Sequence, residues 1–204
     1  MTLDYLTFPS PQPASHALVL LHGWGANAQD LAPLVEMLAL STCTVILPNA
    51  PLPHPYSLAG RMWYDLETGE HFDTACSELE EALQILAERL KLPLRNLMLG
   101  GFSQGGAMAM AVGWDLPLAG LISLSGYLHP SASTPVPWPK PVLLIHGQQD
   151  PVVPIQAAHQ ARQQLASSGF SVEYLELPMA HEINAQALAG VRRFIQGVLE
   201  QSGP

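Results

Sequence analysis

The sequence predicts an α/β protein in which a mostly parallel central sheet carries helices on both faces, within a single domain over residues 1–204. Three observations support this fold class. The strand-like segments, such as residues 17–21, are continuous apolar runs, which is typical of strands covered on both faces. These runs alternate with segments of helical character along the chain. One of them stops at Ser103, between closely spaced glycines, and is followed at once by good helix formers.

Each strand is expected where an apolar run is bounded by glycine, proline or polar residues. The first is a short edge strand before a proline-rich turn, and the one before Ser103 is central to the sheet. The expected strands cover residues 3–8, 17–21, 44–47, 97–102, 118–124, 142–145 and 172–177.

The helices are expected from apolar spacing. A helix over 31–40 has Asp30 near its start, and a leucine stripe at steps of four, three and four predicts a helix through 79–90. Further helices follow Ser103, cover 155–165 and end the chain, where Ile183, Ala187, Val191, Phe194 and Val198 share one face. A proline-rich loop is expected over 131–139, while the segment around 61–65 has no clear element.

Composition limits the classes of function. Of the 204 residues, 48% are hydrophobic and 12% charged, which excludes a mainly disordered chain. The net charge of −9 disfavours nucleic acid and anionic membranes as partners, because both bind clustered Lys and Arg. Cys43 and Cys76 fit neither a disulfide framework nor a zinc pattern, and no signal peptide or membrane span is recognisable. We therefore expect a cytoplasmic protein without stable membrane insertion; a homodimer is possible.

The motif that carries chemistry is G-x-S-x-G, spelled Gly101-Phe102-Ser103-Gln104-Gly105. A serine raised on a strand-to-helix turn needs strained backbone angles and neighbours without a Cβ. The helix N-terminus behind it favours the negative charge that forms when a carbonyl is attacked. The alternative is a glycine-rich turn with an idle serine, but the strand before it and the helix after it favour a nucleophile.

A serine nucleophile needs a base, and the base needs an orienting acid. His181 follows the last strand and precedes the final helix, so its ring can overhang the sheet edge. Asp150 follows a strand end, whereas Asp115 lies too far along the helix and Asp65 is in a segment that we cannot place. The chain order Ser103, Asp150, His181 is the one characteristic of α/β-hydrolases.

The oxyanion hole requires two backbone N–H donors. We expect one from Gln104 and the other from Trp24, in the glycine-rich loop after the early strand, while His22 braces that loop. No metal site is expected, because His181-Glu182-Ile183-Asn184-Ala185 is not H-E-x-x-H, and the glycine motif fits neither a dinucleotide fingerprint nor a P-loop.

These motifs together resemble the phospholipase/carboxylesterase family of α/β-hydrolases, which includes bacterial carboxylesterases and acyl-protein thioesterase-like enzymes. The resemblance covers nearly the whole chain. It rests on the stretches L-L-H-G-W-G at 20–25, L-P-N-A-P at 47–51, R-M-W-Y-D at 61–65, G-F-S-Q-G-G at 101–106, I-H-G-Q-Q-D-P-V-V-P at 145–154 and H-E-I at 181–183.

The resemblance implies an α/β-hydrolase fold, the triad Ser103, Asp150 and His181, and oxyanion donors from Trp24 and Gln104. It also implies hydrolysis of esters, or in some branches thioesters, with no metal and no cofactor. Trp24 departs from the family, which more often has leucine there, and no insertion is long enough to act as a large lid.

The sequence thus predicts a serine carboxylesterase that acts on small-molecule or lipid-like esters of small to medium acyl chains through an acyl-enzyme. Near the mouth, Trp24, Met62, Trp63 and Val152 are expected to contact the acyl chain, with Met62, Trp63 and Val152 as the substrate-binding residues. The alternatives are an acyl-protein thioesterase or lysophospholipase that acts on long acyl chains, and a hydrolase-fold binding protein without activity.

Overall fold

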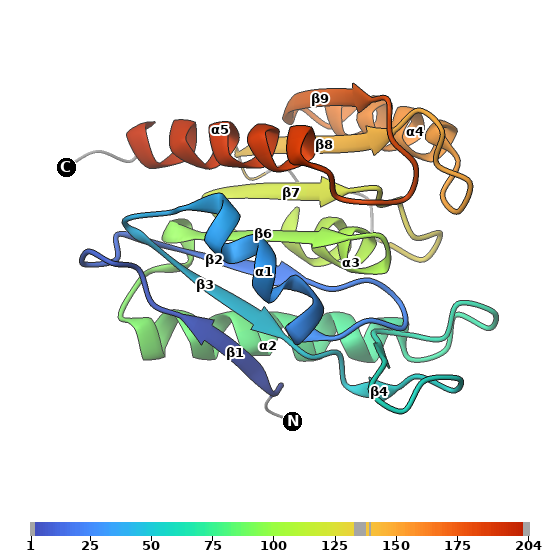
Figure 1. Cartoon of the computed structure of the whole chain (residues 1–204), viewed down its shortest axis with the longest axis horizontal. Helices are drawn as coiled ribbons and strands as arrows, with labels where there is room; N and C mark the ends of the chain where they lie inside the picture. The colour runs from blue at the N-terminus through green and yellow to red at the C-terminus, as the bar shows by residue number, and fades with distance from the viewer. Residues whose placement is uncertain (1–2, 133–137, 139, 202–204) are drawn as a thin grey trace.

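The structure is a computed structural model that describes residues 3–132, 138 and 140–201, and its centre is a seven-stranded sheet (Figure 1). The strand order is β1-β3-β2-β6-β7-β8-β9; β1 lies antiparallel to β3 and the other neighbours pair in parallel. The strands are β1 (Tyr5–Phe8), β2 (His16–Leu21), β3 (Cys43–Pro48), β6 (Leu97–Phe102), β7 (Gly120–Leu124), β8 (Pro141–Gly147) and β9 (Ser171–Leu177).

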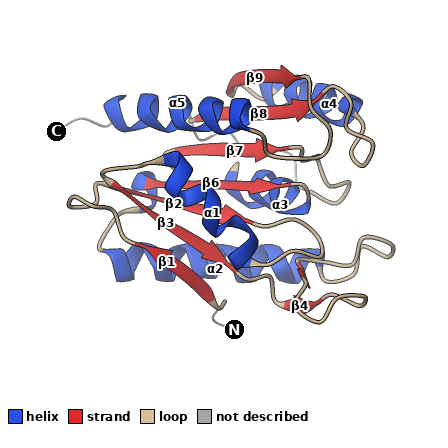
Figure 2. Ribbon diagram, viewed as in Figure 1, coloured by secondary structure: helices blue, strands red, loops and turns tan. Residues whose placement is uncertain are grey.

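Helices cover both faces of the sheet and give the molecule two cores (Figures 1 and 2). Two of them, α1 and α5, pack on one face, and α2, α3 and α4 pack on the other. The helices are α1 (Ala28–Leu38), α2 (Phe72–Leu90), α3 (Gln104–Gly113), α4 (Ile155–Ser167) and α5 (Ala185–Gln201), with a short 3₁₀ helix, η1, at Leu94–Asn96. This arrangement confirms the predicted fold class.

The strands are buried as their composition requires. Every residue of β2 and β3 is buried, and both strands lie inside the sheet between covered faces. The parallel strands β2, β6, β7 and β8 all end at one edge of the sheet, on the right in Figure 1. Residues that follow these strand ends are therefore brought together at this edge.

Several boundaries differ from the expectation. Helix α2 begins at Phe72, ahead of the leucine stripe, because Phe72 and Ala75 are also buried. Helix α5 begins at Ala185, because the Asn184 side chain accepts the N–H of Ala187 at 2.9 Å and so caps the helix, which leaves Ile183 outside it.

The paired strands β4 (Leu52–Pro53) and β5 (Arg61–Met62) were not expected, because two residues carry no periodic pattern. Of the predicted proline-rich loop, residues 133–137 and 139 lie outside the described residues. Across the described part of the chain, no helix is long and apolar enough to cross a membrane.

Candidate active site

Ser103 lies at the turn between β6 and α3 and has the strained backbone angles φ 55° and ψ −117°. A Cβ on Gly101 would be 2.7 Å from the N atom of Gly106, and a Cβ on Gly105 would be 2.6 Å from the carbonyl oxygen of His22. Neither position can carry a side chain without moving backbone. The turn is thus a nucleophile elbow, with its serine at the N-terminus of a helix.

The loop after β2 packs against this elbow. A Cβ on Gly23 would be 3.4 Å from the Cβ of Ser103, so the two backbones approach closely. Among the described residues, neither the N–H of Trp24 nor that of Gln104 has a backbone acceptor outside regular elements. Two free donors beside the serine are what an oxyanion hole needs.

The side chain of Gln104 ties the elbow to the segment around β5. Its Oε1 accepts the N–H of Trp63 at 2.9 Å, and its Nε2 donates to the carbonyl of Tyr64 at 2.7 Å. The side chain is buried, with 1% of the residue exposed. The sequence predicts a role only for the backbone of Gln104, because nothing in the local pattern indicates a partner 41 positions away.

His22 supports the loop after β2, as expected. It is fully buried; its Nε2 accepts the N–H of Ala50 at 3.0 Å, and its Nδ1 lies 2.8 Å from the carbonyl oxygen of Gly23. Because Nε2 is an acceptor, the proton is on Nδ1 and is donated to Gly23. Burial lowers the pKa of His22, which outweighs the hydrogen bond to Gly23 and keeps the ring neutral.

Asp150 and His181 meet at the same sheet edge. Nδ1 of His181 donates to Oδ2 of Asp150 at 2.8 Å, which leaves Nε2 of His181 as the basic nitrogen. The other carboxylate oxygen of Asp150 accepts the N–H groups of Val152 and Val153 at 2.9 and 2.8 Å. His146, packed behind them, has its Nε2 3.6 Å from Oδ2 of Asp150 and 2.8 Å from the carbonyl of Val153.

These contacts hold Asp150 in its ionised form. Burial raises the pKa of the carboxyl group, but the hydrogen bonds from His181, Val153 and Val152 outweigh it, so that the pKa lies below its ordinary value. The carboxylate is fully covered, whereas the side chain of His181 is 16% exposed. An ionised acid behind a partly exposed imidazole suits a base that exchanges a proton with substrate.

The ring of His181 lies beside the elbow, with its centroid 4.7 Å from that of Phe102. Within the described residues, the Ser103 hydroxyl makes no hydrogen bond to His181. Hydrogen bonds between a nucleophile and its base are often long before substrate binds. The triad of Ser103, Asp150 and His181 therefore has its acid–base contact formed, and its serine–histidine contact stays a prediction.

The residues expected to contact an acyl chain are placed differently from one another. Val152 and Trp24 are 63% and 39% exposed, and Met62 is partly buried in β5. Trp63 is fully buried, so it does not face the mouth as expected. Its indole is enclosed because its N–H donates to the carbonyl of His22 at 2.9 Å, and the ring packs near that histidine.

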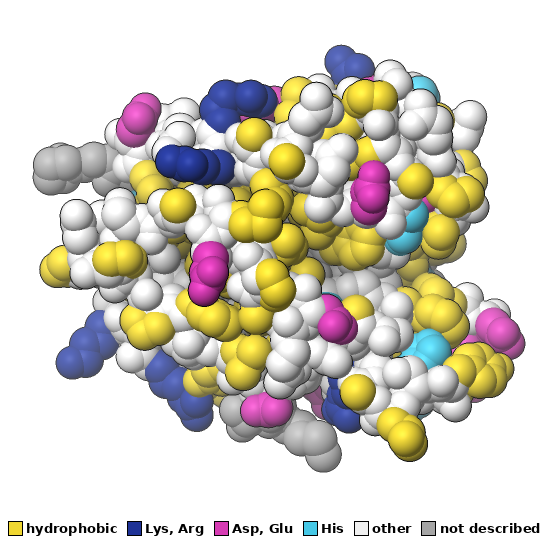
Figure 3. All heavy atoms as spheres, viewed as in Figure 1, with side chains coloured by type: hydrophobic (Ala, Val, Ile, Leu, Met, Phe, Trp, Pro, Cys, Tyr) yellow, Lys and Arg dark blue, Asp and Glu magenta, His cyan; other side chains and the backbone are white. Residues whose placement is uncertain are grey.

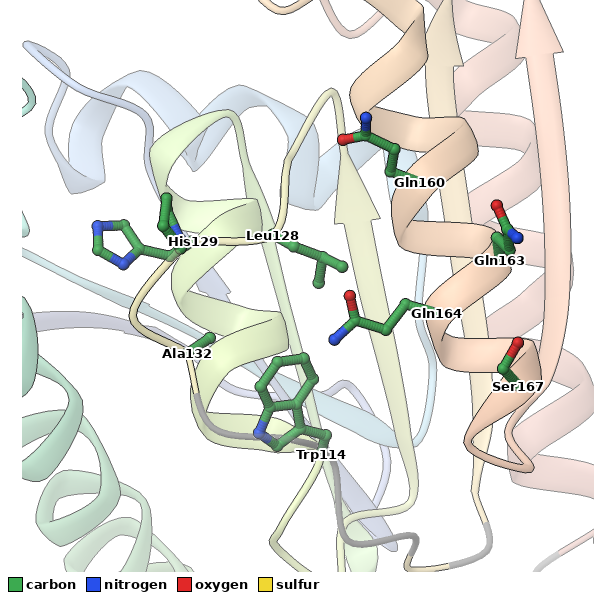
Figure 4. A pocket seen from close by; sticks show the side chains of 9 residues that line it. Trp114, Leu128, His129, Ala132, Gln160, Gln163, Gln164 and Ser167 are labelled. Atoms are coloured by element: carbon green, nitrogen blue, oxygen red, sulfur yellow. The ribbon is translucent and has the colours of Figure 1, made fainter.

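The surface is hollowed at the edge where the strands end, between the part that carries α5 and β9 and the lobe around β4 (Figure 3). A separate cavity of about 530 Å³ lies between the C-terminal end of α3 and α4. Trp114, His129 and Gln164 are among its lining residues (Figure 4), and none of the predicted site residues lines it. Among the described residues, no group of His, Cys, Asp or Glu side chains is arranged to hold a metal ion.

Known proteins match this chain over most of its length. A family model described as phospholipase/carboxylesterase matches residues 6–199, which confirms the resemblance indicated by the motifs. Acyl-protein thioesterase 1 of Neurospora crassa is 29% identical over 91% of this chain and 88% of its own length. The corresponding protein of Debaryomyces hansenii is 26% identical over 93% of this chain and 94% of its own length.

Solved structures agree with this match. The crystal structure of esterase PE8 has a TM-score of 0.90 at 28% identity, and the match covers 97% of this chain and 100% of that one. The carboxylesterase of Bacillus cereus has a TM-score of 0.85 at 19% identity, covering 96% and 94% of the two chains, which is a likeness of fold.

Proposed function

The chain belongs to the phospholipase/carboxylesterase family of α/β-hydrolases, and on that premise we propose that it is a serine carboxylesterase working through an acyl-enzyme. As a member of this family it is a hydrolase. The observation that carries the proposed mechanism is the hydrogen bond between His181 and Asp150, from loops 31 positions apart, beside the elbow that bears Ser103.

In the proposed reaction, the Ser103 oxygen attacks the ester carbonyl and its proton passes to Nε2 of His181. The negative charge on the former carbonyl oxygen is stabilised by the N–H groups of Trp24 and Gln104. His181 gives the proton to the leaving alcohol, and the acyl group stays on the serine. Water then attacks the acyl-enzyme, its proton passes through His181 back to Ser103, and the carboxylic acid leaves. Asp150 stays ionised and orients His181 throughout.

The proposed substrates are carboxylic esters of small to medium acyl chains. The exposed indole of Trp24 supports this choice, because it occupies space at the oxyanion loop that carries it. The ring packs against that of His54, with the two centroids 4.1 Å apart. The alternative is hydrolysis of long-chain thioesters or lysophospholipids; of these, the name acyl-protein thioesterase of the fungal relatives favours a thioester. Met62 and Val152 stay as proposed contacts of the acyl chain.

A fluorophosphonate probe tests the nucleophile. We expect the purified protein to be labelled at Ser103, and Ser103→Ala to lose labelling and about 10³-fold or more of kcat with its fold retained. Retained esterase activity in this variant would refute the assignment. An unlabelled, inactive wild-type protein would instead favour a binding protein.

A series of p-nitrophenyl esters, compared with acyl thioesters of the same chain lengths, tests the substrate class. We expect kcat/KM to be highest for short or medium esters. A maximum for long-chain thioesters would establish the alternative.

The location and assembly of the enzyme are part of the proposal. Cys43 and Cys76 are free, which is consistent with the proposed cytoplasmic location. A homodimer and the absence of a nucleic-acid partner stay predictions, which light scattering and a binding assay with labelled DNA and RNA would test.

A further inference from the structure

Trp63 donates hydrogen bonds to the two separate segments that carry the expected oxyanion donors. Its backbone N–H binds Oε1 of Gln104, and its indole N–H binds the carbonyl of His22, each at 2.9 Å. All three residues are at most 1% exposed. This buried group, consisting of His22, Trp63 and the Gln104 side chain, is called the oxyanion brace below.

On the elbow side, the brace fixes Gln104 by both ends of its amide. The Trp63 N–H can only donate and the Tyr64 carbonyl can only accept, so the amide has one possible orientation. Gln104 is the first residue of α3, and its own N–H points out of the helix N-terminus. A side chain held at both ends therefore limits movement of the backbone that carries this donor.

On the loop side, the brace fixes the peptide unit that carries the second donor. The carbonyl of Gly23 and the N–H of Trp24 belong to the same trans peptide and point in opposite directions. Nδ1–H of His22 holds that carbonyl at 2.8 Å, so the Trp24 N–H is directed the other way. The indole of Trp63 holds the preceding carbonyl, that of His22, and its ring centroid lies 5.5 Å from that of His22.

We propose that Trp63 is a positioning residue for ester hydrolysis, which sets the separation of the Trp24 and Gln104 N–H groups through the oxyanion brace. This inference rests on the proposed function and assigns Trp63 a role other than contact with the acyl chain. Donors that are fixed in place stabilise a developing oxyanion without reorganisation, and a displacement of about 1 Å can cost on the order of 100-fold in rate.

The test replaces Trp63 by phenylalanine, which keeps an aromatic ring and removes the indole N–H. Trp114→Phe is the matched control, because Trp114 is 1% exposed and its Nε1 has no hydrogen-bond partner; it lines the cavity of Figure 4. We expect Trp63→Phe to lower kcat for a p-nitrophenyl ester about 10- to 100-fold with KM changed less than about twofold, and to slow fluorophosphonate labelling in parallel. Trp114→Phe should change neither rate by more than about twofold.

A second variant tests whether misfolding of Trp63→Phe explains its loss of activity. Gln104→Met removes both amide hydrogen bonds and keeps the backbone donor, so it should show the same loss of kcat at unchanged KM. The double variant Trp63→Phe/Gln104→Met should lose less than the product of the single losses, because both changes act on one network.

Three results would overturn the inference. One is an equal loss of kcat in Trp63→Phe and Trp114→Phe, and another is a raised KM at unchanged kcat, which would indicate contact with the acyl chain. The third is a double variant whose loss of kcat equals the product of the two single losses. Each of these leaves the wild-type enzyme active and the proposed function intact, whereas a wild-type protein that neither hydrolyses esters nor reacts with the probe would overturn both.

Discussion

The half of the site that carries the oxyanion donors is more deeply buried than the half that carries the acid and the base. In this oxyanion half, His22, Trp63 and Gln104 are at most 1% exposed and are linked by hydrogen bonds. In the acid–base half, the side chain of His181 is 16% exposed and is oriented by Asp150. The first half holds backbone donors that must not move while charge develops. The second half holds a ring that must exchange a proton with substrate and water. Burial and hydrogen bonding are therefore concentrated around the backbone donors, which stabilise the developing charge by their position alone.

The largest effect should come from the acid–base half. Asp150→Asn removes the charge that orients His181, and we expect kcat to fall about 10³- to 10⁴-fold. Steady-state kinetics on a p-nitrophenyl ester measures this loss.

Asp65→Asn is the matched control. Asp65 uses one carboxylate oxygen to accept the N–H groups of Glu67 and Thr68, both at 2.8 Å, just as Asp150 accepts those of Val152 and Val153. Among the described residues no histidine hydrogen-bonds to Asp65 as His181 does to Asp150, although the charge of nearby His71 helps to lower the pKa of Asp65. Asp65→Asn should therefore leave kcat within about twofold. Equal losses in the two variants would show that the turn matters, and not the charge of Asp150 that orients His181.

The next effect tests the rigidity of the oxyanion half. In Gly105→Ala the new Cβ would be 2.6 Å from the carbonyl oxygen of His22, so either the elbow or the loop must shift. We expect a loss of about 1–3 kcal/mol in the free energy of unfolding, together with a lower kcat. Urea unfolding and kinetics on the same sample measure both.

Gly197→Ala provides the contrast in α5, where a Cβ would meet nothing within 4 Å. That variant should gain about 1 kcal/mol of stability, because alanine is the better helix former. If Gly105→Ala were as stable as the wild type, the inferred close packing of the elbow against the loop would be wrong.

A smaller effect distinguishes the two halves by the pH at which each loses stability. The pKa of His22 is lowered by burial, so below the ordinary value of 6.5 the unfolded chain takes up a proton that the folded chain does not. This residue therefore costs stability as the pH falls from 6.5. For Asp150, whose pKa lies below 3.8, the stabilisation is lost only as the pH falls below that value.

His22→Gln removes the first titration and leaves the second. Unfolding between pH 7 and pH 5 should therefore show a shallower loss of stability in this variant than in the wild type. The buried histidines elsewhere are the same in both proteins, so the difference between the curves isolates His22. Parallel curves would contradict a neutral, buried His22.

The smallest effect concerns the side chain, rather than the backbone, of the oxyanion loop. Trp24→Leu keeps the N–H donor and removes an indole that packs on His54. We expect kcat on an acetyl ester to change less than about threefold, while the ratio of kcat/KM for long over short acyl chains rises up to about tenfold. A large loss of kcat at every chain length would show instead that the indole holds the loop in place.

Much of the fold followed from local signals. Runs such as β2 and β3 were recognisable because a strand covered on both faces is apolar throughout, and Gly101 and Gly105 identified the elbow because a Cβ there meets backbone. The pairing of His181 with Asp150 was predicted from chain order and strand ends. Trp63 was misplaced, because an apolar residue in an irregular segment fits a mouth and a core equally well.

The sequence by itself determined the sheet, the elbow and the residue types of the site, because apolar periodicity and glycine positions act over a few neighbouring residues. Only the tertiary structure decided that Trp63 reaches Gln104 and His22, each 41 positions away, and that Gln104 uses its side chain as well as its backbone. Such bonds depend on which loops the folded sheet brings together, and each polar group buried there takes whatever partner the packing supplies.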